Sequence, residues 1–360
     1  MKVIVIGAGL SGCVAAQQFA AAGHTVTVLE KRSHVAGHAH DYRDANGAMV
    51  HAYGPHLFHT NETAVVEYLS QFTSWLPHEH RILSSVRGKL VPVPINLVTL
   101  RELYGIDLDA AAMRKFLASV ALPRKVVTSE DWLLSTYGPE LTELFFTHYI
   151  RKQWGRSLRE LDWTVASRIK PRFSDDCRTF TDDFQAIPKY GYTALCSEIL
   201  NHKRISLALE CGYEGEVDSL GSDLTVFTGP VDEFFRYQFG PLPYRSLEFV
   251  HNLSLAENPA PTIVFPDASC RFTRVTDWLQ IAGDHRGDHF GTSVLVEFPA
   301  ESGEPMYPIP APEAAALYAK YEELAKSRKD VLFCGRLGLY KYANMDAIVV
   351  DTLGRVKPWL

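Results

Sequence analysis

The glycine-rich segment GAGLSG at residues 7–12 constrains the fold of this chain more than any other feature. It follows a short apolar stretch, Lys2–Ile6, whose β-branched residues predict a buried strand. Residues 13–22 carry small side chains and end before Gly23, which predicts a helix. Thr25–Leu29 predicts a second strand that ends at Glu30. This order is typical of the first βαβ unit of a Rossmann-like α/β domain.

The three glycines of this segment have the spacing of a dinucleotide site. Gly7 permits the tight turn, Gly9 lets the backbone approach a pyrophosphate, and Gly12 lets the helix pack closely on the strand. The helix then directs its positive N-terminal end toward the phosphates. Glu30 lies 18 residues after Gly12, where a carboxylate accepts hydrogen bonds from ribose hydroxyls. The alternative is a tight turn between strand and helix that binds no ligand.

Two further segments indicate which dinucleotide is bound. Residues 34–38, HVAGH, resemble the second glycine segment of the FAD-dependent oxidoreductase and amine-oxidase superfamily, although Ala36 replaces the first of the usual paired glycines. A late Gly-Arg pair before a C-terminal helix, predicted from about residue 345, is also how that superfamily returns to its flavin. The resemblance implies FAD, and it adds these residues to the cofactor site: Lys31, Gly37, His38, Gly335, Arg336 and Met345.

The rest of the chain changes character twice. Helical periods dominate residues 97–163, for example at 129–135 and 140–153, whereas residues 81–94 and 244–299 are rich in Val, Thr and Phe and predict antiparallel strands. Short apolar stretches at 224–227 and 331–333 predict a return to the nucleotide domain. We therefore expect a discontinuous FAD-binding domain (1–77, 181–233 and 310–360), a helical domain (97–163) and an antiparallel sheet domain (78–96, 164–180 and 234–309).

Composition narrows the function classes. The 360 residues carry a net charge of −6, which argues against a general nucleic-acid binder. No stretch approaches the roughly 20 apolar residues of a membrane span, and the apolar opening run lacks a basic region before it. The six cysteines are scattered without a CxxC pair, which indicates reduced thiols. We expect a cytoplasmic protein with no membrane insertion.

Histidines are concentrated near the N-terminus. Two of them, His38 and His40, would share one face of a strand, which raises the possibility of a metal site. No carboxylate or cysteine completes a recognised ligand spacing, so we expect no metal. The six histidines are His34, His38, His40, His51, His56 and His59.

Beyond the cofactor segments, the chain resembles the UDP-galactopyranose mutase family. The segments that carry the resemblance occur in family order and with similar spacing over nearly the whole chain. They are YGPHLFHT (53–60), PVPINL (92–97), KQWGR (152–156), QAIP with GYT (185–188 and 191–193), PMYP (305–308) and GRLGLYKY (335–342).

The resemblance implies an FAD-dependent isomerase that interconverts UDP-galactopyranose and UDP-galactofuranose without net redox change. In the implied mechanism, N5 of the reduced flavin attacks the anomeric carbon and displaces the nucleoside diphosphate. A different sugar hydroxyl then closes the new ring. The cofactor supplies the chemistry, and the protein supplies positioning and electrostatics. The family also implies NAD(P)H as the reductant, a homodimer, and a role in cell-surface polysaccharide biosynthesis.

The resemblance also assigns residues to the substrate site. Arg168 and Arg274 match the two arginines that hold the diphosphate, which suits guanidinium because it binds phosphate bidentately. His56 matches a histidine beside the flavin. Tyr307 and Tyr342 match tyrosines that donate hydrogen bonds to the diphosphate. Four further aromatic residues match the wall that holds the uridine: Phe145, Phe146, Tyr149 and Trp154. The first three of these four would equally form the apolar stripe of a helix.

Several positions depart from the family pattern near the expected sugar nucleotide. Thr179 replaces a tyrosine, His80 replaces an asparagine, and Asn344 replaces an aspartate in the substrate site. Residues 277–279 read Asp-Trp-Leu where Glu-His-Lys is usual. Because an unpaired buried polar group costs about 1–3 kcal/mol, such changes alter specificity. The alternatives are a mutase for another nucleotide sugar, such as a deoxy or N-acetyl form, a flavin amine oxidase, or a flavin-binding protein without catalysis.

Overall fold

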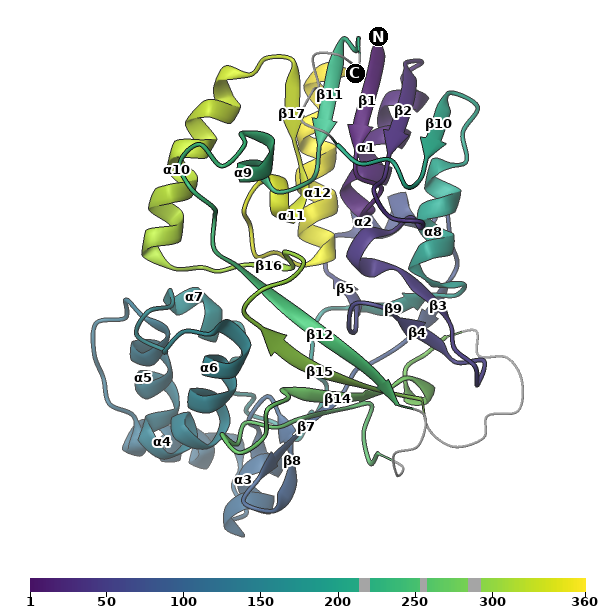
Figure 1. The fold of residues 1–360 in the computed structure, drawn as a ribbon. Helices are drawn as coiled ribbons and strands as arrows, with labels where there is room; N and C mark the ends of the chain where they lie inside the picture. The colour runs from purple at the N-terminus through teal and green to yellow at the C-terminus, as the bar shows by residue number, and fades with distance from the viewer. Residues whose placement is uncertain (214–220, 253–257, 284–292) are drawn as a thin grey trace.

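The structure, a computed structural model, describes residues 1–213, 221–252, 258–283 and 293–360. A five-stranded parallel sheet forms one end of the molecule, and the long strands β12 and β15 cross the molecule below it, beside a group of helices (Figure 1). Figure 1 also places both chain ends beside the parallel sheet.

All strand pairs of the five-stranded sheet are parallel, which confirms the Rossmann-like interpretation. The glycine segment lies between β1 and α1, as expected, but the helix begins three residues earlier than predicted. In sheet order the strands are β10 (Ile205–Ala208), β2 (Thr25–Leu29), β1 (Lys2–Ile6), β11 (Leu224–Phe227) and β17 (Val331–Phe333).

Both faces of this sheet are covered, because successive side chains of a strand point to opposite faces. Val3 and Val5 pack into the core formed with α1 (Leu10–Ala21), α8 (Gly191–Leu200) and α12 (Met345–Val356). Ile4 and Ile6 pack into the opposite core with residues of α9 (Val231–Phe234) and α10 (Pro312–Ser327). The sheet therefore draws on the first, middle and last parts of the chain.

A second sheet of seven strands lies below the first in Figure 1. Its pairs are antiparallel, as predicted, except that β7 and β13 run parallel. In sheet order the strands are β16 (Tyr307–Pro308), β12 (Tyr244–Asn252), β15 (Val294–Ala300), β14 (Arg274–Asp277), β13 (Thr262–Val264), β7 (Ile82–Val86) and β8 (Lys89–Val93).

The predicted helical region carries five α-helices and one π-helical turn, and they share a core with β8. The expected helix at 140–153 is interrupted by a π turn, whereas Gly138, with φ +72° inside α5, lies between the two predicted helical periods. The helices are α3 (Leu97–Tyr104), α4 (Ala110–Val120), α5 (Ser129–Thr142), the π turn η2 (Glu143–Thr147), α6 (His148–Trp154) and α7 (Trp163–Ala166).

Short elements connect these parts. A three-stranded sheet has the order β5 (Phe58–Thr60), β9 (Phe184–Pro188), β6 (Trp75–Pro77), and a hairpin pairs β3 (Asp41–Arg43) with β4 (Met49–His51). The remaining helices are α2 (Thr63–Leu69), α11 (Gly335–Gly338) and the 3₁₀ turns η1 (Gly37–Ala39), η4 (Trp278–Gln280) and η5 (Lys357–Trp359).

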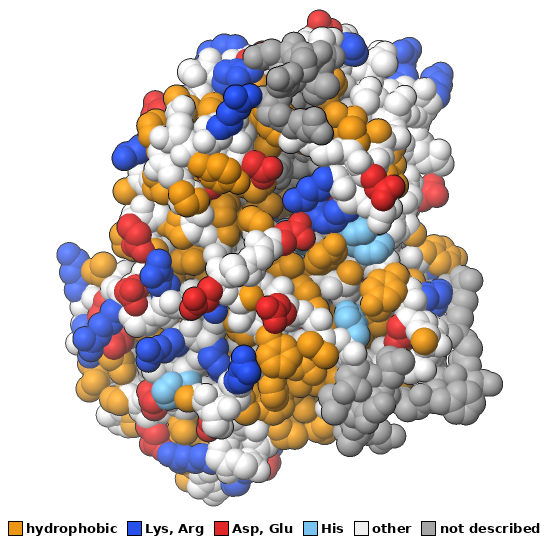
Figure 2. Space-filling model, in the orientation of Figure 1, with side chains coloured by type: hydrophobic (Ala, Val, Ile, Leu, Met, Phe, Trp, Pro, Cys, Tyr) orange, Lys and Arg blue, Asp and Glu red, His pale blue; other side chains and the backbone are white. Residues whose placement is uncertain are grey.

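No helix within the described ranges is long and apolar enough to span a bilayer. On the face drawn in Figure 2, acidic and basic side chains are interspersed without a broad patch of one charge. All six cysteines are free thiols.

Candidate active site

The glycine turn has the close packing that its spacing predicts. A Cβ atom on Gly12 would lie 1.9 Å from the carbonyl oxygen of Gly7, so only glycine lets α1 approach the turn. Gly7 itself has φ +99° and donates its N–H to the carbonyl of Leu29 at 2.7 Å. The turn is thereby fixed to the ends of both β1 and β2.

The second glycine segment folds against this turn. The N–H of Ala36 donates to the carbonyl of Ala8 at 2.8 Å, and a Cβ on Gly37 would lie 3.0 Å from the Cα of Gly9. Ala36 has φ +72°, a left-handed conformation that favours glycine, which is the residue usually found there. The chain accommodates the alanine at some strain, and the contact between the two segments is kept.

Glu30 sits at the end of β2 and holds the turn together. Its side chain is 2% exposed. One carboxylate oxygen accepts from the N–H of Ala8 at 2.8 Å, and the other accepts from the N–H of Arg32 at 2.9 Å. Carboxylate lone pairs that remain can accept from further donors such as ribose hydroxyls.

One pocket brings together ten of the eleven residues predicted for the cofactor. Gly12 is the exception, because it packs behind the turn against Gly7. The pocket extends from the end of β2 to α11 and α12, and its aromatic lining includes Tyr213 and Phe227. The ten residues are Gly7, Gly9, Glu30, Lys31, Gly37, His38, His56, Gly335, Arg336 and Met345.

Three predicted residues meet at the α11 end of this pocket. The guanidinium of Arg336 lies 3.3 Å from Nδ1 of His38, and His56 lies nearby with its Nδ1 2.8 Å from the carbonyl of Gly54. Burial, and then the positive charge of Arg336, hold the pKa of His56 well below its ordinary value. His56 is therefore neutral, with Nδ1–H donated to Gly54 and its other nitrogen available as an acceptor.

The two predicted diphosphate arginines come from different parts of the fold. Arg168 follows α7, lies 4.3 Å from the ring centroid of Tyr342, and donates to the side-chain oxygen of Asn344. Arg274 opens β14, and its guanidinium lies 3.5 Å from the hydroxyl of Tyr149 on α6. Each arginine thus contacts at least one residue that the sequence assigned to the substrate.

Aromatic rings connect these arginines to the cofactor pocket. Trp154 packs edge-on against Tyr342 at 5.0 Å and against Tyr307 at 6.3 Å. The guanidinium of Arg336 lies 5.4 Å from the centroid of Tyr307. Tyr307 therefore borders both the cofactor end and the predicted diphosphate end of the site.

Phe145 and Phe146 have a different environment. Both are buried in the core of the helical region, and Phe146 stacks with Tyr137 at 5.1 Å. This position agrees with the alternative interpretation of an apolar helical stripe. Contact of these two rings with a base stays a prediction.

Sequence reasoning missed Glu297. It lies on β15 directly across from Arg274, with a carboxylate oxygen 3.4 Å from Nε of that arginine, and it is 1% exposed. Burial raises the pKa of Glu297, and Arg274 lowers it. Burial lowers the pKa of Arg274, whereas Glu297 and then the hydroxyl of Tyr149 raise it. The net result is a raised pKa, so the guanidinium stays charged. An acidic residue in a strand of alternating pattern gives no signal that it faces inward.

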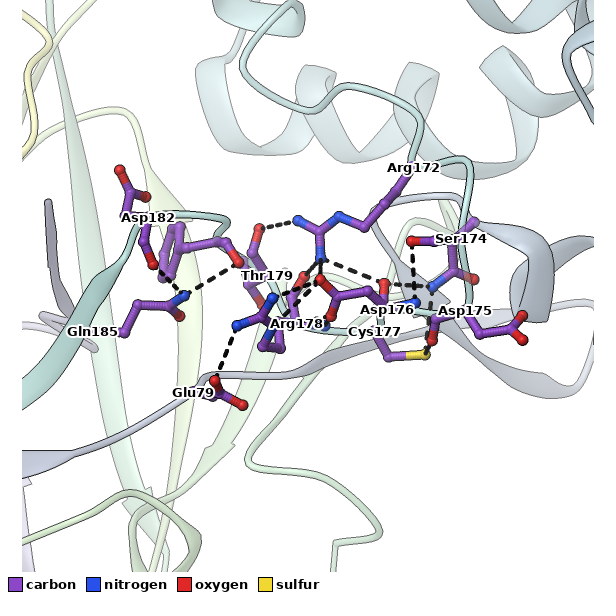
Figure 3. Close-up of polar contacts among 12 residues, drawn as sticks. Glu79, Arg172, Ser174, Asp175, Asp176, Cys177, Arg178, Thr179, Asp182 and Gln185 are labelled. Carbon is purple, nitrogen blue, oxygen red and sulfur yellow. Dashed lines mark hydrogen bonds and ion pairs between the residues drawn. The ribbon is translucent and has the colours of Figure 1, made fainter. Parts of the chain in front are cut away.

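The loop at 170–179, which contains one of the departures, is tied down by its own side chains. Figure 3 shows the guanidinium of Arg172 turned toward the backbone of residues 176–179, where it donates to the carbonyl of Thr179 at 3.4 Å. Arg178 pairs with Asp176 and, at 2.9 Å, with Glu79. The hydroxyl of Thr179 is buried and finds no hydrogen-bond partner within the described parts of the chain.

Three of the other departures are buried: His80, Asp277 and Trp278. His80 lies between Nε2 of His78 and the hydroxyl of Thr262, each 3.1 Å away, and burial lowers the pKa of His80 to about 3. Trp278 is completely enclosed and packs 4.8 Å from His51. Asp277 caps the η4 turn by accepting from the N–H of Leu279 at 3.1 Å.

The histidine group near the N-terminus does not have the strand geometry considered above. His38 lies in the η1 turn, and His40 follows it and stacks on His34 at 3.6 Å. Among the residues that the structure describes, no three His, Cys, Asp or Glu side chains are placed to hold a metal ion.

Comparison with known proteins gives one consistent result. A family model described as UDP-galactopyranose mutase matches residues 144–342, and a model for an NAD(P)-binding Rossmann-like domain matches residues 5–72. A probable UDP-galactopyranose mutase of Klebsiella pneumoniae is 33% identical over 98% of this chain and 93% of its own length. A dTDP-fucopyranose mutase of Escherichia coli is 31% identical over 98% and 96%. A crystal structure of reduced UDP-galactopyranose mutase superposes with a TM-score of 0.78 at 16% identity, covering 100% of this chain and 96% of that one.

Proposed function

The chain belongs to the UDP-galactopyranose mutase family, and from this we propose that it interconverts UDP-galactopyranose and UDP-galactofuranose with FAD as cofactor. One observation carries the proposal: Tyr307 borders the dinucleotide pocket through Arg336 and the arginine-containing site through Trp154 and Tyr342. A flavin ring at that end of the pocket would face a nucleotide sugar held by Arg168 and Arg274.

The residues around the pocket fit FAD. The turn and the second segment are held in contact by glycines whose added Cβ atoms would collide, and α1 presents its N-terminal end to the pocket. Gly9, Glu30, Gly37 and Arg336 would hold the dinucleotide. When bound and reduced, FAD would supply the nucleophile for the ring chemistry.

The chain's own side chains would handle charge and orientation. Arg168 and Arg274 would hold the diphosphate while it is detached from the sugar and keep it in place for return. Glu297 fixes the direction of the Arg274 guanidinium, and Tyr149 meets that guanidinium from α6. Neutral His56 would accept a hydrogen bond at the flavin end without adding positive charge.

A second candidate is the same ring interconversion on another nucleotide sugar. The 31% identity to a dTDP-fucopyranose mutase favours it. The departures Thr179 and His80 favour it too, and they are neighbours, because the N–H of Thr179 donates to the carbonyl of His80 at 2.7 Å. A deoxy sugar lacks one hydroxyl, and the replacement of the usual tyrosine by Thr179 removes a phenol that could pair with such a group.

A substrate panel separates the two candidates. The reduced, FAD-loaded protein is incubated with UDP-galactofuranose and with dTDP-fucofuranose, and the pyranose products are separated by chromatography. Arg274→Met serves as the inactive control. The first proposal predicts a higher kcat/KM with UDP-galactofuranose by about tenfold or more, and the reverse order favours the second candidate. No conversion of either compound contradicts both.

Other inferences rest on sequence patterns or on the family resemblance, and they are proposed at that level. They are the division into three domains, a homodimer, NAD(P)H as reductant, a cytoplasmic location and a role in cell-surface polysaccharide biosynthesis. The retention of both diphosphate arginines and His56 argues against the amine-oxidase and non-catalytic alternatives.

A further inference from the structure

Lys152 on α6 makes an unusual set of contacts with the hairpin between β13 and β14. Its ammonium lies within hydrogen-bond distance of four backbone carbonyls of that hairpin. The four oxygens belong to Phe265 at 2.6 Å, Asp267 at 2.9 Å, Cys270 at 3.0 Å and Phe272 at 3.1 Å. An ammonium has three protons and a compact charge, so it satisfies such a ring of carbonyls as a small cation would.

The hairpin that Lys152 holds leads directly into Arg274. The N–H of Phe265 donates to the carbonyl of Thr273 at 2.9 Å, which closes the hairpin just before β14 begins. The rings of Phe265 and Phe272 pack at 4.8 Å across it. Lys152 therefore fixes the backbone of this hairpin, and its contact with the carbonyl of Phe272 lies two residues before Arg274.

The other end of this connection is the helix that carries Tyr149 and Trp154. Tyr149 precedes Lys152 by three residues, so both side chains lie on the same side of α6. Arg245 of β12 fixes the end of the helix, because its guanidinium donates to the carbonyls of Lys152 at 2.9 Å and Gln153 at 3.0 Å. Helix α6 is thus held to the seven-stranded sheet from two directions.

We propose that Lys152 is a positioning residue that sets the placement of Arg274 relative to the aromatic residues of α6. The structural basis is that one ammonium joins the two backbones that carry the guanidinium and the hydroxyl of Tyr149, whose atoms lie 3.5 Å apart. The inference rests on the proposed function, since it assumes that Arg274 and Tyr149 bind a nucleoside diphosphate.

The test measures nucleotide binding directly and does not need turnover. UDP and dTDP are titrated calorimetrically into the FAD-loaded wild type and into Lys152→Met, Lys152→Arg and the control Lys89→Met. Lys89 also donates to a backbone carbonyl, that of Glu102 at 2.6 Å, but it lies on the edge strand β8, which β13 and β7 separate from the strand of Arg274. Flavin content and Tm are recorded for each variant.

We expect Lys152→Met to weaken nucleotide binding by about tenfold, with a matching rise in KM, a smaller change in kcat and wild-type flavin content. Lys152→Arg keeps the charge but presents a planar fork, so we expect an intermediate loss. Lys89→Met should bind nucleotide as the wild type does. In a double-mutant cycle, Lys152→Met should cost less when Arg274→Lys is already present, because the positioned guanidinium is gone.

Unaltered nucleotide affinity in Lys152→Met would overturn the inference, as would a loss confined to Tm and flavin content. If Lys152→Met does not fold, Lys152→Arg decides by the same measurement. Failure of the wild type to bind either nucleotide would instead overturn the proposed function, and this inference with it.

Discussion

At the scale of single residues, the pairing of Arg274 with Glu297 determines how the predicted diphosphate site is charged. The two residues are direct partners across β14 and β15, and the carboxylate is almost completely enclosed. A buried charge requires a partner, because removing one member leaves the other uncompensated. The negative charge of Glu297 therefore keeps Arg274 ionised and oriented, at the expense of part of its attraction for a diphosphate.

Replacing the carboxylate by an amide tests this role. Glu297→Gln keeps the shape and removes the charge, so the Arg274 guanidinium loses its fixed partner. We expect a fall in kcat/KM of about tenfold or more and a loss of stability of about 1–3 kcal/mol. Kinetics and urea denaturation provide the measurements, and Glu301→Gln, at an exposed position past the end of the same strand, is the control. Wild-type kinetics in Glu297→Gln would contradict the role.

A second residue-scale prediction concerns the glycine turn. Gly12→Ala places a Cβ 1.9 Å from the carbonyl oxygen of Gly7, so either the turn or α1 must move. We expect almost complete loss of bound flavin, measured by absorbance at constant protein concentration. Gly354→Ala is the matched control: it also lies in a helix, its Cβ would meet nothing within 4 Å, and it should raise stability by up to about 1 kcal/mol. Full flavin content in Gly12→Ala would contradict this account of the turn.

The residue scale also marks the limit of sequence reasoning. The glycines, Glu30 and Arg336 follow from spacing or from resemblance, and the structure gathers them at one pocket. Glu297 could not be found in this way, because a charged residue in an alternating strand normally faces solvent. Its inward direction depends on the register between β14 and β15, which no local pattern fixes.

At the scale of elements, Asn96 joins a helix start to the loop that carries Thr179. Its side-chain oxygen accepts from the N–H of Thr99 at 2.8 Å, which caps α3, and its amide nitrogen donates to the carbonyl of Asp176 at 3.0 Å. The side chain is completely buried. One residue therefore serves both the helix and the loop shown in Figure 3.

Two substitutions separate these contributions. Asn96→Asp keeps the cap and loses the donor to the loop, whereas Asn96→Ala loses both. We expect Asn96→Ala to lower the free energy of unfolding by about 2–3 kcal/mol. Asp109→Ala removes an exposed helix cap, which accepts from the N–H of Ala112 at 2.7 Å. This substitution should lower the free energy of unfolding by only about 1 kcal/mol. Urea denaturation measures both losses. An equal loss of unfolding free energy in Asn96→Ala and Asp109→Ala would show that the bond from Asn96 to Asp176 contributes nothing.

Element prediction from sequence succeeded where a pattern was long or repeated. Four of the five parallel strands, the helical region and the strands at 81–94 and 244–299 occur where they were expected, whereas β10 was not predicted. The helix predicted over 140–153 was wrong in detail, because the π turn at 143–147 divides it. The parallel pairing of β7 with β13 was also not predicted, since pairing between distant strands is set by tertiary packing.

At the scale of the whole molecule, several buried histidines couple stability to pH. Burial lowers the pKa of His51 to about 3, of His78 to about 4 and of His80 to about 3. The unfolded chain titrates near pH 6.5, so below that pH the unfolded state binds more protons than the folded one. Stability is therefore insensitive to these groups above about pH 7 and falls as the pH is lowered toward 4.

Between pH 7 and pH 5.5, the free energy of unfolding should fall by about 1 kcal/mol for each fully buried histidine, and by less for the half-buried His78. Urea denaturation at the two pH values measures it. His80→Asn should reduce the dependence by about one histidine's share. A free energy of unfolding that is constant from pH 7 to pH 5.5 would contradict this prediction.

The central claim is that this chain interconverts the two ring forms of a nucleotide sugar and needs reduced FAD to do so. The most direct measurement follows UDP-galactofuranose by chromatography in the presence of the protein, once oxidised and once reduced with dithionite. The account predicts conversion to UDP-galactopyranose by the reduced protein, with no consumption of reductant in proportion to product, and none by the oxidised protein. Equal conversion in both states, or reductant consumed in step with product, would contradict it.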